Sequence, residues 1–281
     1  MADKYGAVWV SHSSIGDFLK CPRLYYLHNV YKDPKTRRKI TAVSGAMALG
    51  SAVHGTLEAL KELPLEERLT RDLLADYEQH WQTLASGKKG GFTNTEDESA
   101  MKARGRAMIE RVIANPGPIA KKTVRLKKHH NDVVPNFFLS EDEGLILCGA
   151  VDWLEYIPED DSLRIIDFKT GKYEEEKNSL QLPIYLLLLK ELQHRAVHGA
   201  AYWYLEKDDA PVEMALPDAT EARERVLALA RTIKDTRTAQ AFACPRGEEG
   251  CYGCRPYEKI LRGEAEYVGI AQYGQDGYLV T

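Results

Sequence analysis

The sequence contains two segments that decide its fold, Gly149-Ala150-Val151-Asp152 and Ile165-Ile166-Asp167-Phe168-Lys169-Thr170-Gly171-Lys172. Each places an aspartate directly after apolar residues, and the second aspartate follows the first by 15 residues. A polar turn between them predicts two adjacent strands that bring Asp152 and Asp167 side by side. Because side chains alternate along a strand, Asp167 and Lys169 should share one face of a sheet, with Phe168 on the other.

An aspartate at the end of a buried strand is costly unless it binds a cation or accepts compensating hydrogen bonds. Two carboxylates and one ammonium group suit a hard divalent cation beside a phosphate. The cation would lower the pKa of a bound water and polarise a phosphoryl oxygen, while the lysine positions that water. The same three residues also fit a structural ion-pair network on a sheet.

Other polar residues lie at spacings that suit the same site. Gln181 and Tyr185 are four positions apart and should project from one face of an expected helix over 176–192. There an amide and a phenol can hydrogen-bond a DNA backbone or the groups around the cation. His54 follows a run of small residues, Gly50-Ser51-Ala52-Val53. Taken singly, these residues also fit ordinary polar side chains of a protein core.

Together, these motifs resemble the RecB-like branch of the PD-(D/E)XK nucleases. That branch carries a Gly-x-x-Asp strand, an Asp-x-Lys strand often continued as Thr-Gly-Lys, a Gln-x-x-x-Tyr helix and an N-terminal histidine. The resemblance implies a restriction-endonuclease-like α/β fold, with a mixed central sheet flanked by helices. It further implies an N-terminal helical insertion over 61–120 within a single domain over 1–281.

The resemblance also implies a role for each matching position. Asp152, Asp167, His54 and the carbonyl of Phe168 would bind Mg²⁺ or Mn²⁺. Lys169 would position the attacking water, with Gln181 and Tyr185 beside it. The implied activity is hydrolysis of DNA phosphodiester bonds, from ends more than internally, hence a metal-dependent exonuclease.

The five cysteines suggest a second metal centre. In a cytoplasmic chain, Cys251-x-x-Cys254 with Cys244 nearby indicates metal binding rather than disulfides. A fourth ligand is needed, and Cys21 is the expected one. Cys148, within an expected strand, should be a buried small hydrophobic residue.

The distribution of these cysteines resembles a subset of the same branch, the AddB nuclease domain and CRISPR-adaptation exonucleases. In that subset such cysteines hold a [4Fe-4S] cluster, which would here close the region 238–262 onto Cys21. The chain departs from the usual order, because the single Cys244 precedes the Cys-x-x-Cys pair. A four-thiolate Zn²⁺ site and the absence of any metal therefore remain alternatives.

Hydrophobic periodicity predicts the other elements. The expected helices are 13–30, 45–60, 65–84, 94–113, 176–192 and 220–236. The expected strands are 124–130, 133–139, 145–156, 163–168, 200–206 and 211–216. After 236 the chain is expected to be rich in loops.

Charge and composition limit the functional class only loosely. The formal net charge of -4 gives no global attraction to nucleic acid. The basic stretch 121–130 can supply phosphate contacts or guard a strand edge with lysines. Four aromatic residues of the expected strands can stack on single-stranded bases or fill the core: Trp153, Tyr202, Trp203 and Tyr204.

The sequence also bears on location and partners. It has no apolar run long enough to span a membrane and no secretory signal pattern, so a cytoplasmic protein without membrane association is expected. Gly45–Ser51 resembles a phosphate-binding loop but lacks its lysine. DNA with a free end or single-stranded character is the expected substrate, and a separate helicase or CRISPR adaptation proteins the expected partners. The role would lie in DNA repair, recombination or CRISPR adaptation, and the alternative is a non-catalytic DNA-end-binding subunit.

Overall fold

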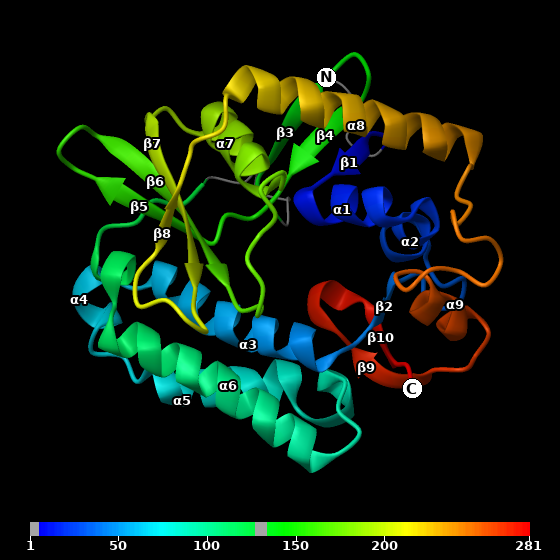
Figure 1. Ribbon diagram of the computed structural model, residues 1–281, viewed down its shortest axis with the longest axis horizontal. Coiled ribbons are helices and arrows are strands. Elements are labelled where there is room, and N and C mark those ends of the chain that lie inside the picture. Colours follow the sequence, from blue (N-terminus) through cyan, green and yellow to red (C-terminus); the bar gives the residue numbers. More distant parts are fainter. Residues whose placement is uncertain (1–5, 127–133) are drawn as a thin grey trace. The chain divides into compact units, whose positions relative to one another are not determined.

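The computed structural model describes residues 6–126 and 134–281 (Figure 1). The chain divides into two compact units, each built from three segments. The first unit comprises Met1–His12, Val53–Tyr77 and Gly105–Arg231, and the second comprises Ser13–Ala52, Glu78–Arg104 and Thr232–Thr281. The helical insertion expected at 61–120 within one domain stays a prediction.

The first unit contains a mixed four-stranded sheet in the order β5-β6-β7-β8. Its strands are β5 (Trp153–Ile157), β6 (Ser162–Lys169), β7 (Val197–Tyr204) and β8 (Val212–Met214). β5 and β6 are antiparallel, β6 and β7 parallel, and β7 and β8 antiparallel. A three-stranded sheet in the same unit has the order β1-β4-β3, with β1 (Val8–Val10), β4 (Leu145–Cys148) and β3 (Asn136–Ser140). The mixed α/β architecture expected from the sequence is confirmed.

Both faces of β6 are covered, which explains why its residues from Ile165 to Phe168 are buried. On one face the rings of Trp153 and Trp203 lie 6.2 and 6.0 Å from that of Phe168. The other face carries Asp167 and Lys169 and is approached by α7 (Gln181–Leu192). Trp153, Tyr202, Trp203 and Tyr204 are all buried, so these four aromatic residues fill the core and do not form a stacking surface.

The remaining α-helices are α1 (His12–Lys20), α2 (Pro22–Tyr25), α3 (Gly45–Ala59), α4 (Leu65–Arg68), α5 (Leu73–His80), α6 (Thr95–Ala114), α8 (Ala219–Ala239) and α9 (Arg255–Leu261). They lie in the first unit, in the second unit, or, like α3, α6 and α8, contribute residues to both. The second unit also has a three-stranded sheet in the order β2-β10-β9, with β2 (Ile40–Ala42), β10 (Asp276–Leu279) and β9 (Glu266–Ile270). The region after 236 does contain a long loop, since residues 240–254 form no helix or strand, but the prediction missed α9, β9 and β10.

Three predicted helices are shorter or interrupted. The helix expected over 13–30 breaks at Cys21, whose extended backbone (φ -169°, ψ 121°) precedes Pro22, the first residue of α2. The helix expected over 65–84 is divided, since Asp72 accepts a hydrogen bond from the Ala75 N–H and caps a new helix, α5. The helix expected over 176–192 begins only at Gln181.

The strand predicted over 145–156 is two strands, β4 and β5, that belong to different sheets. Residues 149–152 between them are not in a strand. A Cβ atom at Gly149 would lie 3.1 Å from Leu188 on α7, so the close approach of that helix favours glycine. Of the basic stretch 121–130, residues 127–130 lie outside the described residues. Among the described residues, no helix is both long and apolar enough to cross a membrane.

Candidate functional site

The first unit brings Asp152 close to the end of β6 and to α3. Asp152 is buried, and its Oδ2 accepts a 2.9 Å hydrogen bond from the backbone N–H of Phe168. The Nδ1 atom of His54, on α3, lies 3.4 Å from the same oxygen. The carboxylate of Asp152 is thereby held between the β6 backbone and a histidine of a helix.

Glu58 adds a third potential ligand beside this pair. One ligand atom each from His54, Glu58 and Asp152 lies within 4.8 Å of the other two. Glu58 was missed by the sequence analysis, although its position four residues after His54 places both on one face of α3. The His-x-x-x-Glu spacing was the available signal.

Asp167 lies at the centre of a second group of contacts. Its Oδ1 accepts hydrogen bonds from Gln181 Nε2 (2.7 Å) and the Tyr185 hydroxyl (3.1 Å). Its Oδ2 is buried, lies 3.0 Å from Lys169 Nζ and accepts no hydrogen bond of good geometry. Gln181 Nε2 also donates to the Tyr185 hydroxyl at 3.0 Å, so α7 fixes one side of the carboxylate.

Lys169 is almost enclosed by its neighbours. Besides Asp167, its Nζ contacts Glu175 Oε2 at 2.8 Å and donates to Gln181 Oε1. The ring centroid of Tyr202 lies 4.7 Å from the same nitrogen. Glu175 lies in the segment between β6 and α7. No motif in the sequence indicated that it would contact Lys169.

The pKa values of His54, Asp152 and Asp167 are shifted because these ionisable groups are buried and lie close to one another. Burial and the charge of Asp152 raise the pKa of Asp167 to about 7, despite the opposing effect of Lys169. Burial opposes a charged His54, but Asp152 outweighs it and raises the histidine pKa to about 9. Burial likewise opposes ionisation of Asp152, and His54 with the Phe168 N–H lowers its pKa. Asp152 and Asp167 therefore differ in protonation near neutral pH.

This donor set fits a hard divalent cation. Two buried carboxylates, an imidazole and an additional acidic side chain are ligands that Mg²⁺ and Mn²⁺ accept. The Asp167 Oδ2 atom is buried without a hydrogen bond, and such an atom is expected to find a partner. A cation would also remove the repulsion that raises the pKa of Asp167. His54, Asp152, Asp167, Lys169, Gln181 and Tyr185 all belong to the first unit.

Four cysteines of the second unit form a separate cluster. The sulfur atoms of Cys21, Cys244, Cys251 and Cys254 all lie within 4.8 Å of one another, and the last two are 3.7 Å apart. Cys21 and Cys254 are fully buried in a hydrophobic cluster with Leu24, Leu27, Ile40, Tyr257 and Ile260. Four convergent thiols fit a metal or an iron–sulfur cofactor.

The cysteine thiols differ in acidity. Burial raises the pKa of Cys254 to about 12 and also raises that of Cys21. Backbone N–H groups of Cys254 and Gly253 outweigh burial at Cys251 and lower its pKa to about 7. Cys148 is only partly buried and donates its S–H to the Val10 carbonyl, so its expected full burial was wrong.

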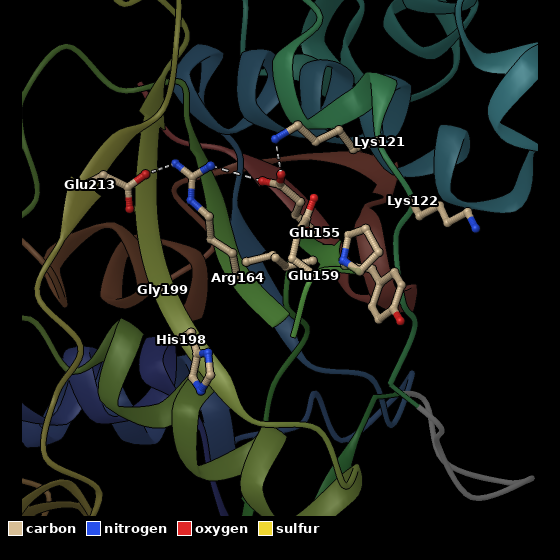
Figure 2. A pocket seen from close by; sticks show the side chains of 11 residues that line it. Lys121, Lys122, Glu155, Glu159, Arg164, His198, Gly199 and Glu213 are labelled. Atoms are coloured by element: carbon tan, nitrogen blue, oxygen red, sulfur yellow. Dashed lines mark hydrogen bonds and ion pairs between the residues drawn. The ribbon is translucent and has the colours of Figure 1, made fainter. Parts of the chain in front are cut away.

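A separate charged cavity of about 560 Å³ lies on the sheet face opposite Asp167 (Figure 2). Arg164 pairs there with Glu155 at 3.1 Å and with Glu213, and Lys121 also donates to Glu155. Glu155 is buried, so this network compensates a buried carboxylate. These opposite charges neutralise one another, so the network explains how Glu155 is tolerated in the interior.

Comparison with known proteins gives one family. Residues 9–259 match the family model described as the PD-(D/E)XK nuclease superfamily. No curated protein matches the chain. The matched range spans most of the chain and includes His54, Asp152, Asp167 and Lys169, and the mixed α/β architecture is consistent with the restriction-endonuclease-like fold. With a match of this extent, the chain belongs to the PD-(D/E)XK nuclease superfamily.

Proposed function

We propose that the protein is a Mg²⁺- or Mn²⁺-dependent deoxyribonuclease whose active site is centred on Asp152, Asp167 and Lys169. Membership of the superfamily implies a metal-dependent nuclease in general. The observation that carries the assignment is the buried Asp167 carboxylate, which has Lys169 at 3.0 Å and Gln181 and Tyr185 on its other oxygen. Asp152 raises the pKa of this same group.

In this proposal Asp152, Asp167, His54 and the Phe168 carbonyl hold the cation. When bound, the cation supplies a more acidic water and a Lewis acid for the phosphoryl oxygen. Lys169 provides a positive charge that can orient the attacking water or a phosphate oxygen. Gln181 and Tyr185 keep one Asp167 oxygen in place, which leaves its Oδ2 for the cation.

We further propose a RecB-like exonuclease that acts on DNA with a free end or a single-stranded region. The sequence motifs support this branch, and no phosphate-binding loop with its lysine occurs in the sequence. A separate helicase or CRISPR adaptation proteins would then supply unwound or bound DNA, in repair, recombination or adaptation. A cytoplasmic location belongs to the same proposal.

For the cysteines we propose a [4Fe-4S] cluster held by Cys21, Cys244, Cys251 and Cys254. Resemblance to cluster-bearing members of the branch supports it. The second candidate is a Zn²⁺ ion bound by the four thiolates. Tetrahedral Zn–S bonds of about 2.3 Å place the sulfur atoms roughly 3.8 Å apart, which is close to the spacing observed here. The Cys251–Cys254 separation is 3.7 Å.

Cleavage of end-labelled DNA tests the nuclease assignment. Purified protein should release short products with Mg²⁺ or Mn²⁺ and none in EDTA. Asp167→Ala and Lys169→Ala should each reduce the rate by at least about 10³-fold without changing the circular dichroism spectrum. Folded wild-type protein that binds DNA ends but cuts no substrate would instead identify a non-catalytic end-binding subunit.

Elemental analysis with visible spectroscopy tests the cysteine assignment. A [4Fe-4S] protein should contain about four iron atoms per chain and absorb broadly near 400 nm. A colourless protein with one zinc atom per chain would refute the cluster and support Zn²⁺. The nuclease test is independent of this result.

A further inference from the structure

Lys169 is only 16% exposed, and its ammonium group is contacted by three protein oxygens. Its Nζ is surrounded by Asp167 Oδ2 at 3.0 Å, Glu175 Oε2 at 2.8 Å and Gln181 Oε1. A lysine ammonium has three N–H donors, which equals the number of oxygens around it. The Tyr202 ring covers a further side at 4.7 Å. A phosphate oxygen that is to accept a hydrogen bond from Lys169 therefore competes with oxygens that already surround this nitrogen.

Two of these oxygens belong to groups that are held in place. Asp167 is buried within β6 and also accepts hydrogen bonds from Gln181 and Tyr185. Gln181 is the first residue of α7, and its Nε2 donates hydrogen bonds to Asp167 and to the Tyr185 hydroxyl. Displacing either group would break several hydrogen bonds at once.

Glu175 is held differently. It lies in the segment 170–180, which contains no helix or strand, and its side chain is 22% exposed, against 2% for Asp167. Its backbone N–H donates to the Tyr204 hydroxyl at 3.1 Å, so the main chain can stay in place while the side chain rotates. The Glu175 carboxylate is also an oxyanion, as is a phosphodiester.

We propose that Glu175 occupies on Lys169 the position of a DNA phosphate oxygen, and that DNA must displace this carboxylate in order to bind. The inference rests on the proposed nuclease function and assigns the phosphate subsite within it. Glu175 is then a competitor of the substrate: it lowers the affinity for DNA and keeps Lys169 in position while the site is empty.

The neighbouring Glu174 offers a matched control. It lies in the same segment and pairs with Lys207 at 2.6 Å, on an exposed part of the surface. Glu174→Gln and Glu175→Gln each remove one negative charge and each replace a lysine–carboxylate ion pair by a weaker contact with a neutral amide. Any general gain of DNA affinity from the lost charge should therefore be equal in the two variants.

Binding of a fluorescent single-stranded oligonucleotide, followed by anisotropy in EDTA, tests the proposal. The Kd of Glu175→Gln should be about fivefold to twentyfold lower than that of wild type, and that of Glu174→Gln should change less than about twofold. With Mg²⁺ or Mn²⁺, the KM of Glu175→Gln should fall in parallel. Melting temperatures establish that both variants fold.

Two results would overturn the proposal. Equal DNA affinities for Glu175→Gln and Glu174→Gln would show that Glu175 does not compete with DNA. A lower kcat of Glu175→Gln at unchanged Kd would show that Glu175 instead positions Lys169. The affinity comparison is made in EDTA and does not depend on whether the nuclease assignment holds, whereas the kcat comparison requires a protein that cuts DNA. That assignment fails only if the folded wild-type protein cuts no DNA with either cation.

Discussion

The backbone N–H of Phe168 donates a 2.9 Å hydrogen bond to Asp152 Oδ2. The strand that carries Asp167 and Lys169 therefore also orients the acidic residue that precedes β5. Because β5 and β6 are neighbours in register, with Trp153 opposite Ile166, the two acidic residues depend on a single strand pairing.

Substitutions at Asp152 should separate cleavage from stability. Both Asp152→Asn and Asp152→Ala should abolish cleavage, since neither offers a charged ligand. Only Asp152→Ala leaves the buried Phe168 N–H without an acceptor, which should cost about 1–3 kcal/mol more than Asp152→Asn. Urea unfolding of both variants gives this difference, and equal free energies of unfolding would contradict the role of the hydrogen bond.

Cation binding should strengthen as the pH rises through 7. Asp167 has a pKa of about 7 and His54 of about 9, so both must lose protons before they bind a cation. The affinity for Mn²⁺, measured by calorimetry with the wild-type protein in the absence of DNA, should increase about tenfold or more between pH 6 and pH 8. An affinity independent of pH would rule out Asp167 as a ligand.

The metal-free protein should show the opposite trend in stability. Asp167 has a folded-state pKa above its unfolded value of about 3.9, so its contribution to stability is present below pH 4 and lost as the pH rises through 7. Asp167→Asn removes this titration. Its melting temperature in EDTA should therefore rise relative to wild type between pH 4 and pH 8, and a constant difference would be evidence against the raised pKa.

Tyr185→Phe should test the support that α7 gives to Asp167. The hydroxyl donates to Asp167 Oδ1 and accepts from Gln181, so its loss removes one hydrogen bond from each. We expect kcat to fall about fivefold to tenfold, as the loss of about 1 kcal/mol implies. The matched control is Tyr204→Phe, whose hydroxyl contacts the Glu175 backbone N–H and not Asp167. A larger loss in the control would place the important hydroxyl elsewhere.

Serine at each cluster cysteine should remove the bound metal. Cys21→Ser, Cys244→Ser, Cys251→Ser and Cys254→Ser should each lower the metal content per chain and the melting temperature. Cys148→Ser is the control, because this thiol bonds to the Val10 carbonyl outside the cluster and should leave the metal content unchanged. Metal retained in all four variants would exclude the cluster as the binding site.

The charged network on the opposite sheet face should matter for folding only. Glu155→Ala removes a buried carboxylate and leaves Arg164 with Glu213 as its remaining acidic partner, so the free energy of unfolding should fall by about 2–3 kcal/mol. The cleavage rate per folded molecule should stay within about twofold of wild type. A large loss of rate at full stability would connect this cavity to the reaction.

The sequence allowed the central strands to be predicted, and the predicted site residues of β6 and α7 lie close together in the structure, because the signals for both are local. β6 combines the apolar residues Leu163, Ile165 and Ile166 with Asp167 and Lys169 on one face, and the Gln181–Tyr185 spacing is visible within one helix. The break between β4 and β5 was not anticipated, since Gly149 meets Leu188, a residue of a distant segment. Tertiary contacts of this kind carry no local signal.

Two other features depended on long-range contacts in the same way. The helix predicted over 176–192 starts only at Gln181, whose side chain contacts Asp167 and Lys169 of β6. Strands β9 and β10 were missed because each is short and their pairing with each other and with β2 is settled only by the fold.

The cysteine cluster has a consequence for synthesis of the chain. Cys21 is made early, but Cys254, which lies beside it in the same hydrophobic cluster, comes 233 positions later. At about 5–20 residues per second, the ribosome needs roughly ten to fifty seconds to cover that interval. Throughout it, Leu24, Leu27 and Ile40 lack Cys254, Tyr257 and Ile260, so the second unit cannot complete this hydrophobic cluster until its last residues have been made.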